Sequence, residues 1–274
     1  MTPTPAVPRS VRRSFSRAVP PPRADWVGPN DYVGAFPSAD VTRSDIDRLL
    51  VAGASGGTGR EVLRLLGPRP VSVRALTRSS ERRRSLRAAG ADEVVVGDLF
   101  DPNDARSAVE GVDAVISVVG SGPQDLLSPG EFVDGRGNRT LLDAAIDEGA
   151  ESFVMESALG VGTDPTSWLG SVFDAAIGPI QRAKADAEAA IRGSPIRHTI
   201  LRPGILTNGS RTDEVRVARP GAHLWGAVAR ADVARLLAAA PWTLEAADET
   251  FEVVGPCGGG RGEPLVLDWR LPGR

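Results

Sequence analysis

Apolar and polar positions follow two different periodicities along this chain, and the first clear pair begins at residue 49. Residues 49 to 52, LLVA, form a short continuous apolar run, which is typical of a strand buried on both faces. In the segment that follows, apolar residues recur at helical spacing at Val62, Leu63, Leu65 and Leu66. The pattern therefore predicts a strand, a short turn and a helix in direct succession.

The turn between this strand and this helix is rich in glycine and has the spacing GxxGxxG from Gly53 to Gly59. Glycine allows a sharp reversal and a close approach of the backbone to a diphosphate, and the N-terminus of the helix offers unpaired N–H groups. The spacing departs from the GxGxxG fingerprint, and a plain tight turn in an α/β fold is the alternative. The context favours a dinucleotide site built on Gly53, Ser55, Gly56, Gly57, Thr58 and Gly59.

The same alternation continues to residue 201. Strands that alternate with helices at this pace indicate βαβ units with right-handed crossovers. The fold class is therefore α/β, with a doubly wound and mostly parallel sheet. Further strands are predicted at 71–76, 92–99, 112–121, 152–157 and 196–201, and helices at 79–90, 101–110, 132–148 and 180–192.

Beyond Pro203 the alternation becomes less regular. In a doubly wound sheet the ligand lies at the carboxyl ends of the strands, and the later loops contact the substrate. We therefore expect one domain over residues 46–255, with a small C-terminal substrate-side lobe mainly over 203–230, and a flexible tail over 256–274. The remaining predicted elements are a short strand at 214–218, a helix at 230–240 and a last strand at 249–254.

The first 45 residues differ in composition from the rest. Residues 1–24 contain six prolines and five arginines but no acidic residue, so they cannot bury enough apolar surface to fold alone. A disordered arm, an organelle transit peptide and a basic arm that binds a partner are the alternatives, and residues 25–45 indicate a polar linker. Since residues 1–24 lack the apolar core of a secretory signal, we expect a cytoplasmic protein, or an organelle matrix or stroma location if the arm is a transit peptide.

Composition narrows the classes of partner. A net charge of −3 gives no reason to expect nucleic acid or an anionic membrane, and no apolar run reaches the roughly 18 residues that a spanning helix needs. With Cys257 as the only cysteine, neither an internal disulfide nor a cysteine-rich zinc site can form, and no metal site is predicted. A small-molecule substrate is expected, but neither its identity nor the oligomeric state is predicted.

Nine segments in order resemble the atypical short-chain dehydrogenase/reductases, specifically the NmrA-like group of NAD(P)-binding proteins. The glycine turn and TILRPGILT are distinctive by themselves, and the order of all nine supports the resemblance. It implies a Rossmann sheet with a bound nicotinamide dinucleotide. The segments are AGASGGTG (52–59), VRALTR (73–78), GDLFD (97–101), DAVISVVG (113–120), NRTLLDAAIDEG (138–149), FVMESALGVG (153–162), KADAEAAIRGS (184–194), TILRPGILTNG (199–209) and RADVARLL (230–237).

Residues at the end of the second predicted strand indicate which dinucleotide binds. About twenty residues past the glycine turn, NAD sites carry an acid that accepts hydrogen bonds from the ribose. This chain has Thr77, Arg78 and Ser79 there, and no acid occurs from Val71 to Ser80. Because a guanidinium binds a 2′-phosphate with paired donors, we predict NADP(H) as the cofactor, with NAD(H) as the alternative. The alternative role for Arg78 is to stack on the adenine without contacting the 2′-phosphate.

The resemblance places further residues at the cofactor. Asp98, followed by Leu99, would lie beside the adenine, and capping of a turn is the alternative role for this aspartate. Gly120 and Ser121 close the fourth strand, where a missing side chain would let the backbone approach the cofactor. The last group consists of Pro203, Gly204 and Ile205, which by resemblance face the nicotinamide. The alternative is a simple turn that starts a loop.

Short-chain dehydrogenases that reduce carbonyls typically use serine, tyrosine and lysine, with the tyrosine four residues before the lysine. By this resemblance Ser157 is the serine, and Lys184, the only lysine of the chain, is the lysine. The tyrosine position holds Ile180, which has no proton to donate, and the only tyrosine is Tyr32. Lys184 can still hydrogen-bond the nicotinamide ribose, and the alternative is an exposed lysine without a role.

Without the tyrosine, the proton for a reduction must come from water or another side chain. His223, in the substrate-side lobe, is one candidate, whereas the pattern favours a hydrogen-bonded core or edge histidine for His198. Two functions are therefore considered. One is an NADPH-dependent reductase of a small apolar or quinone-like substrate, and the other is a non-catalytic NAD(P) sensor or scaffold.

Overall fold

The computed structural model describes residues 46–121, 131–162, 168–261 and 263–273, without the side chains of 168–177. All of these residues belong to one compact unit, Arg43–Arg274. The predicted arm and linker over 1–45, including Tyr32, lie outside the described residues. Within the described part of the chain, no helix is long and apolar enough to cross a bilayer.

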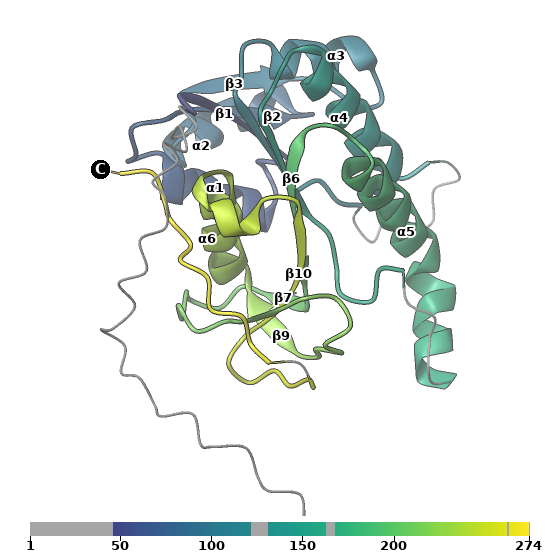
Figure 1. Cartoon of the computed structure of the whole chain (residues 1–274). Coiled ribbons are helices and arrows are strands. Elements are labelled where there is room, and N and C mark those ends of the chain that lie inside the picture. Colours follow the sequence, from purple (N-terminus) through teal and green to yellow (C-terminus); the bar gives the residue numbers. More distant parts are fainter. Residues whose placement is uncertain (1–45, 122–130, 163–167, 262, 274) are drawn as a thin grey trace, which may run out of the picture. The chain divides into compact units, whose positions relative to one another are not determined.

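The described strands form one eight-stranded sheet and one two-stranded sheet (Figure 1). The order in the large sheet is β3-β2-β1-β4-β5-β6-β10-β8, and each neighbouring pair is parallel except β10 with β8. This confirms the predicted doubly wound, mostly parallel α/β sheet. The strands are β1 (Arg48–Ala52), β2 (Ser72–Thr77), β3 (Glu93–Val96), β4 (Ala114–Ser117), β5 (Ser152–Glu156), β6 (Arg197–Pro203), β8 (Arg216–Ala218) and β10 (Glu249–Val254).

Helices cover both faces of this sheet, because its central strands are apolar on both sides (Figure 1). Leu49 and Val51 of β1 pack in one core with α1, α2 and α6, whereas Leu50 and Ala52 pack in a second core with α3, α4 and α5. Alternate residues of one strand thus bury opposite faces of the sheet. The helices are α1 (Gly57–Leu66), α2 (Arg83–Ala88), α3 (Pro102–Val109), α4 (Asn138–Asp147), α5 (Trp168–Arg192) and α6 (Arg230–Ala239), with short turns η1 (Ser80–Arg82), η3 (Val133–Gly137), η4 (Ala240–Trp242) and η5 (Leu244–Ala246).

Helix α5 is longer than the sequence pattern predicts. It has 25 residues and contains Pro179, whereas the pattern predicts a start at Ile180. The dipeptide Gly178-Pro179 is a local signal for the end of a helix or for a turn. Pro179 removes one backbone hydrogen bond, and its ring crowds the carbonyl four residues earlier, but the 25-residue helix continues through it.

Two short strands in the expected substrate-side lobe, β7 (Ile205–Thr207) and β9 (Ala227–Ala229), form a parallel pair that the pattern does not predict. Each has only three residues, which is too few for a detectable period. Gly204 alone separates β6 from β7, and a Cβ there would collide with the carbonyl of Gly226. The pair therefore begins at the carboxyl edge of the large sheet, and its contact with a substrate stays a prediction.

The tail over 256–274, which the sequence predicts to be flexible, packs against the core in its described part. Trp269 is 9% exposed and meets Phe251 edge to face, with ring centroids 5.7 Å apart. Leu265 donates a backbone hydrogen bond to Val217. Figure 1 shows this segment in yellow beside α6. The apolar residues of this tail, which is rich in glycine and proline, follow neither the helical nor the strand period. The sequence therefore does not show which surface they cover.

Candidate functional site

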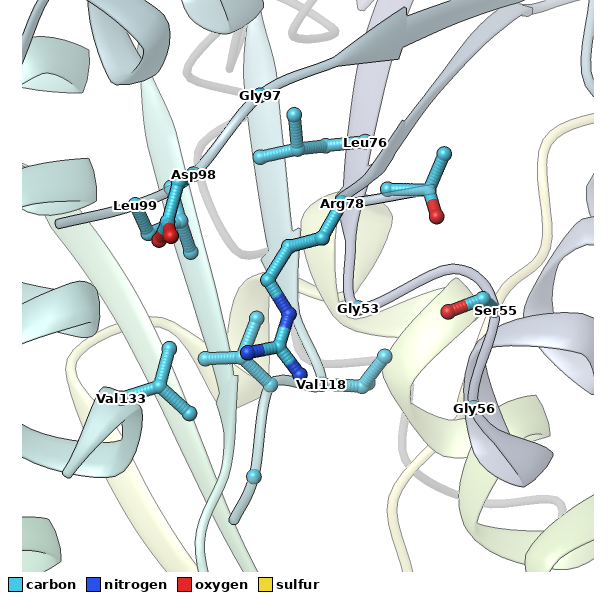
Figure 2. Close-up of a pocket in the computed structure, with 13 residues that line it drawn as sticks. Gly53, Ser55, Gly56, Leu76, Arg78, Gly97, Asp98, Leu99, Val118 and Val133 are labelled. Atoms are coloured by element: carbon cyan, nitrogen blue, oxygen red, sulfur yellow. The ribbon is translucent and has the colours of Figure 1, made fainter. Parts of the chain in front are cut away.

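A pocket lies where the strand order of the sheet reverses, at the carboxyl ends of β1 and β4. Open α/β sheets bind ligands at this position. Seven of the predicted cofactor residues meet there, at or just after the ends of four strands. The lining consists of Gly53, Ser55, Gly56, Leu76, Thr77, Arg78, Gly97, Asp98, Leu99, Val118, Val119, Gly120 and Val133 (Figure 2).

Three glycines of the turn have different roles. Gly53 has φ +78°, which favours glycine, and a Cβ there would lie 2.6 Å from the carbonyl oxygen of Val118. A Cβ on Gly59 would lie 2.5 Å from the carbonyl oxygen of Gly53, so Gly59 allows α1 to pack against the turn. A Cβ on Gly56 would meet the same oxygen at 3.3 Å and nothing closer. Gly56 also lines the pocket, so its missing side chain leaves room for a ligand.

Helix α1 begins beside the pocket without a side-chain cap. Its N-cap residue is Gly56, and its first turn, which includes Gly57 and Thr58, contains no acidic residue. The first N–H groups of a helix have no partner within the helix, and the helix dipole adds positive potential at this end. The N-terminus of α1 therefore suits an anion such as a diphosphate.

Arg78 brings a full positive charge to the same pocket. Figure 2 shows its side chain extending from the end of β2 into the space between Asp98 and the glycine turn. The guanidinium forms no ion pair or hydrogen bond with any residue that the structure describes, and Arg78 is exposed. An unpaired guanidinium together with an uncapped helix N-terminus fits a ligand with two separate phosphate groups, as in NADP.

Asp98 lines the pocket and also caps a turn. Its Oδ1 accepts a hydrogen bond from the N–H of Phe100 at 3.0 Å. Both roles considered from the sequence are therefore compatible with its position. Ser121 has another partner, because its N–H donates to Asp134 Oδ2 at 2.7 Å.

Comparison with known protein families agrees with this geometry. A family described as NAD(P)H-binding matches residues 53–241, from the first glycine of the turn to the end of α6 and into η4. The chain belongs to this NAD(P)H-binding family. The match confirms the resemblance to the atypical short-chain dehydrogenase/reductases and a nicotinamide dinucleotide as the class of cofactor.

Several known proteins are similar to the chain over most of its length. The uncharacterized sugar epimerase YhfK of Bacillus subtilis (strain 168) is 32% identical over 193 residues, which cover 70% of this chain and 86% of YhfK. Sanguinarine reductase of Eschscholzia californica is 29% identical over 245 residues, which cover 75% of this chain and 88% of the reductase. The structure of ChuY, an anaerobillin reductase from Escherichia coli O157:H7, has a TM-score of 0.63 at 26% identity and covers 80% of this chain and 100% of ChuY.

Lys184 is mostly buried and is part of an ion pair. Its side chain is 12% exposed, and its Nζ lies 2.8 Å from Oδ1 of Asp134 in η3. Asp134 is 1% exposed, and its other oxygen accepts the N–H of Ser121. The lysine therefore joins α5 to the segment that follows β4. The sequence does not single out Asp134, because an acid at the start of a predicted helix is an ordinary surface feature. Contact of Lys184 with the nicotinamide ribose stays a prediction.

The hydroxyl of Ser157 belongs to a buried network on the α5 side of the sheet. It donates to Glu188 Oε1 at 2.6 Å, and Glu188 also accepts hydrogen bonds from Arg202 and Arg192. Burial acts to raise the pKa of Glu188, but the hydrogen bonds from Arg202, Ser157 and Arg192 outweigh it and hold the pKa below its usual value. The proton of Ser157 is thus directed at a carboxylate, and its catalytic role stays a prediction.

The predicted nicotinamide-side residues follow one another at the end of β6. Pro203 is its last residue and is buried, whereas Ile205 is 74% exposed. The N–H of Gly204 donates to the carbonyl of Val253, so this glycine joins β6 to β10. None of the three lines the pocket of Figure 2. Ile180 lies one turn before Lys184 on α5 and is half-buried.

The two histidines differ in their surroundings. His198 is buried near the amino end of β6, at the opposite edge from the pocket, and its Nδ1 lies 3.2 Å from Asp248 Oδ1. This position agrees with the hydrogen-bonded histidine that the pattern favours. His223 is exposed in the loop between β8 and β9, with a positive φ of 50°. Its role as a proton source stays a prediction.

One buried acid at the carboxyl edge was not identified from the sequence. Glu156 is the last residue of β5, and its Oε1 accepts a hydrogen bond from the hydroxyl of Thr58 at 2.9 Å. Burial raises the pKa of Glu156 to about 7, although the hydrogen bond from Thr58 and the charges of Lys184 and Arg230 act to lower it. The available signal was a charged residue at the end of the apolar run FVM, in a strand predicted to be buried.

Proposed function

We propose that this protein is a reductase that uses NADPH to transfer a hydride to a small apolar or quinone-like substrate. The nicotinamide would supply the hydride, and the proton would come from water or His223. The chain binds the cofactor and positions the substrate. The observation that carries the choice of NADPH is the guanidinium of Arg78, which lies in the pocket without a partner among the described residues. The absence of any acid from Val71 to Ser80 supports the same choice.

An apolar substrate is favoured by side chains of the lobe at the carboxyl edge. Ile205 is 74% exposed, and Trp225, two residues before β9, is 67% exposed. The N–H of Ile205 donates to the carbonyl of Gly226, the residue after Trp225, so the two side chains belong to neighbouring segments. An exposed apolar patch often marks a ligand surface. Sanguinarine reductase and the anaerobillin reductase ChuY are named as reductases, which supports the same type of reaction for this chain.

The alternative is a non-catalytic NAD(P) sensor or scaffold. Two observations favour it. Ile180 offers no proton at the position where related enzymes have tyrosine, and the hydroxyl of Ser157 is committed to Glu188.

Oxidation of NADPH separates the two functions. The protein, loaded with NADPH under anaerobic conditions, would be mixed with a panel of quinones, flavins and enones while the absorbance of NADPH is followed. A reductase should oxidise NADPH with at least one acceptor at a rate proportional to protein concentration, and Arg78→Ala should raise the NADPH concentration required. Full occupancy by NADPH with no oxidation by any acceptor would refute the reductase and leave the sensor. Native mass spectrometry of the purified protein would identify the cofactor it carries.

A further inference from the structure

Arg230, the first residue of α6, extends over the glycine turn. A Cβ on Gly57 would lie 2.6 Å from Arg230 Cδ and 2.9 Å from its Nε, so the side chain passes directly over the first residue of α1. Its Nη1 donates to Asn208 Oδ1 at 2.8 Å and to the carbonyl oxygen of Leu206 at 3.3 Å. Both acceptors are neutral. Among the described residues, Arg230 forms no ion pair.

Two positive features therefore meet at this point. The N-terminus of α1 carries the positive end of the helix dipole, and cations are normally favourable at the opposite end of a helix. A guanidinium held beside this end by neutral acceptors favours the binding of an anion. The diphosphate of the cofactor is the anion that an uncapped helix after a glycine turn binds.

A buried acid contacts the next residue of the same helical turn. Glu156 is 9% exposed, and it accepts its hydrogen bond from Thr58, the second residue of α1. The charged groups that act on it are Lys184 from α5 and Arg230 from α6, and its partner in β6 is the apolar Leu201. Both cations favour the carboxylate, whereas burial favours the neutral acid, and the resulting pKa of Glu156 is about 7. A small change in local charge is enough to change its protonation near neutral pH.

We propose that Arg230 and Glu156 form a proton-linked extension of the cofactor site, in which Arg230 binds the diphosphate and Glu156 takes up a proton from solvent when the diphosphate arrives. The new negative charge disfavours the carboxylate, and Arg230 is drawn from Asn208 toward the phosphate oxygens, where its charge is neutralised. Binding and proton uptake are reciprocal, so the affinity for the dinucleotide falls as pH rises above 7. The inference rests on cofactor binding and not on the reduction of any substrate.

Titration of the protein with NADPH between pH 7 and 9 tests this linkage. In that range the 2′-phosphate, whose pKa is about 6, stays almost fully ionised. The dissociation constant of the wild type should rise roughly tenfold over this range, and by no more than about a hundredfold, because at most one proton is taken up with the ligand. Glu156→Gln keeps the shape and the acceptor for Thr58, and its dissociation constant should not change with pH. Glu61→Gln, which removes a half-buried carboxylate of the same helix that is paired with Arg64, is the matched control and should behave as the wild type.

Calorimetry gives a second readout. In two buffers of different ionisation enthalpy at pH 8, the wild type should take up part of one proton per NADPH, and Glu156→Gln should take up none. Thr58→Val removes the hydrogen bond that favours the carboxylate, so it should move the pH dependence to higher pH. Unchanged proton uptake in Glu156→Gln would overturn the proposal.

The role of Arg230 is tested with both cofactors. Arg230→Ala should weaken NADPH and NADH by the same factor, roughly tenfold or more, because both contain the diphosphate. Arg235→Ala removes a cation from the same helix that is paired with Asp213, and it is the matched control. Wild-type affinity in Arg230→Ala, or no NADPH binding at any pH, would overturn the proposal. Proton-linked binding without oxidation of NADPH by any acceptor would support it and refute only the reductase.

Discussion

The hydroxyl of Ser157 donates a hydrogen bond of 2.6 Å to the buried carboxylate of Glu188, 31 residues later in the chain. Glu188 has no exposed surface, and Arg202 and Arg192 supply its other donors. A buried carboxylate requires such donors, because an ion removed from water without partners is strongly destabilising. Ser157 therefore contributes to the fold in the position where related enzymes use a serine for catalysis.

Replacing Ser157 with alanine should lower the free energy of unfolding by about 1.5–3 kcal/mol, because it removes a hydrogen bond to a charged group. NADPH affinity should change little. Urea denaturation and a fluorescence titration measure the two quantities. The control is Ser152→Ala in β5, the strand that ends one residue before Ser157. Ser152 is buried and its hydroxyl makes no hydrogen bond to a described residue, so this substitution should lower the free energy of unfolding by less. Unchanged stability with a roughly hundredfold loss of reductase rate would instead assign Ser157 to catalysis.

Arg78→Ala should discriminate between the two cofactors. The substitution removes a charged hydrogen-bond donor of the 2′-phosphate, so NADPH binding should weaken by about 1.5–3 kcal/mol while NADH binding changes much less. Dissociation constants for both cofactors are measured by titration. Arg82→Ala, on an exposed residue of η1 that does not line the pocket, is the control. Equal losses for NADPH and NADH would show that Arg78 contacts a part common to both, such as the adenine.

Two glycines of the turn should respond differently to substitution by alanine. In Gly56→Ala the new Cβ meets the carbonyl oxygen of Gly53 at 3.3 Å, so the protein should fold and lose most of its affinity for NADPH. In Gly59→Ala the same oxygen lies 2.5 Å away, so the turn must shift, at a cost of about 1–3 kcal/mol in stability or more. Thermal melting and NADPH titration of both variants test this. Wild-type affinity in a folded Gly56→Ala would contradict the placement of the diphosphate.

The ion pair of Lys184 and Asp134 is testable by a double-mutant cycle. Lys184→Met leaves the carboxylate of Asp134 buried without its cation, and the free energy of unfolding should fall by about 3–5 kcal/mol. Adding Asp134→Asn should recover most of that loss, because the buried charge is then removed. Chemical denaturation of the wild type, both single variants and the double variant gives the coupling energy. Additive losses would show that the two residues do not interact in solution.

Glu156 should make the stability of the protein depend on pH. Its pKa rises from 4.5 to about 7 in the folded state, so between these values the folded protein holds a proton that the unfolded chain has released. The free energy of unfolding therefore falls as pH rises through this window, by about 3 kcal/mol in total. Glu156→Gln lacks this loss and should exceed the wild type in stability at pH 8, with the difference decreasing toward pH 4.5. A difference independent of pH would contradict the raised pKa.

Local sequence patterns were sufficient to predict the elements that follow one another directly in the chain and also pack together. The strand over 49–52, the glycine turn and the helix after it are adjacent in sequence and in space, and β1 and α1 occur where they were predicted. The pattern failed where an element is short or interrupted. Strands β7 and β9 have three residues each, and Pro179 lies inside α5. In these places packing at longer range decides the structure, and local propensity does not reveal it.

By itself, the sequence determined the class of fold and the family. It also predicted seven of the residues that line the pocket, because they lie next to the ends of strands, and strand ends can be read from hydrophobic periodicity. Arg78 is such a residue. Only the tertiary structure decided which groups act on one another across the carboxyl edge. Thr58 and Glu156 are 98 positions apart in the sequence, and Arg230, which lies over Gly57, belongs to α6 near the C-terminal end of the domain. The pKa of Glu156 depends on burial and on charges from two other helices, which are properties of the packed molecule and of no segment alone.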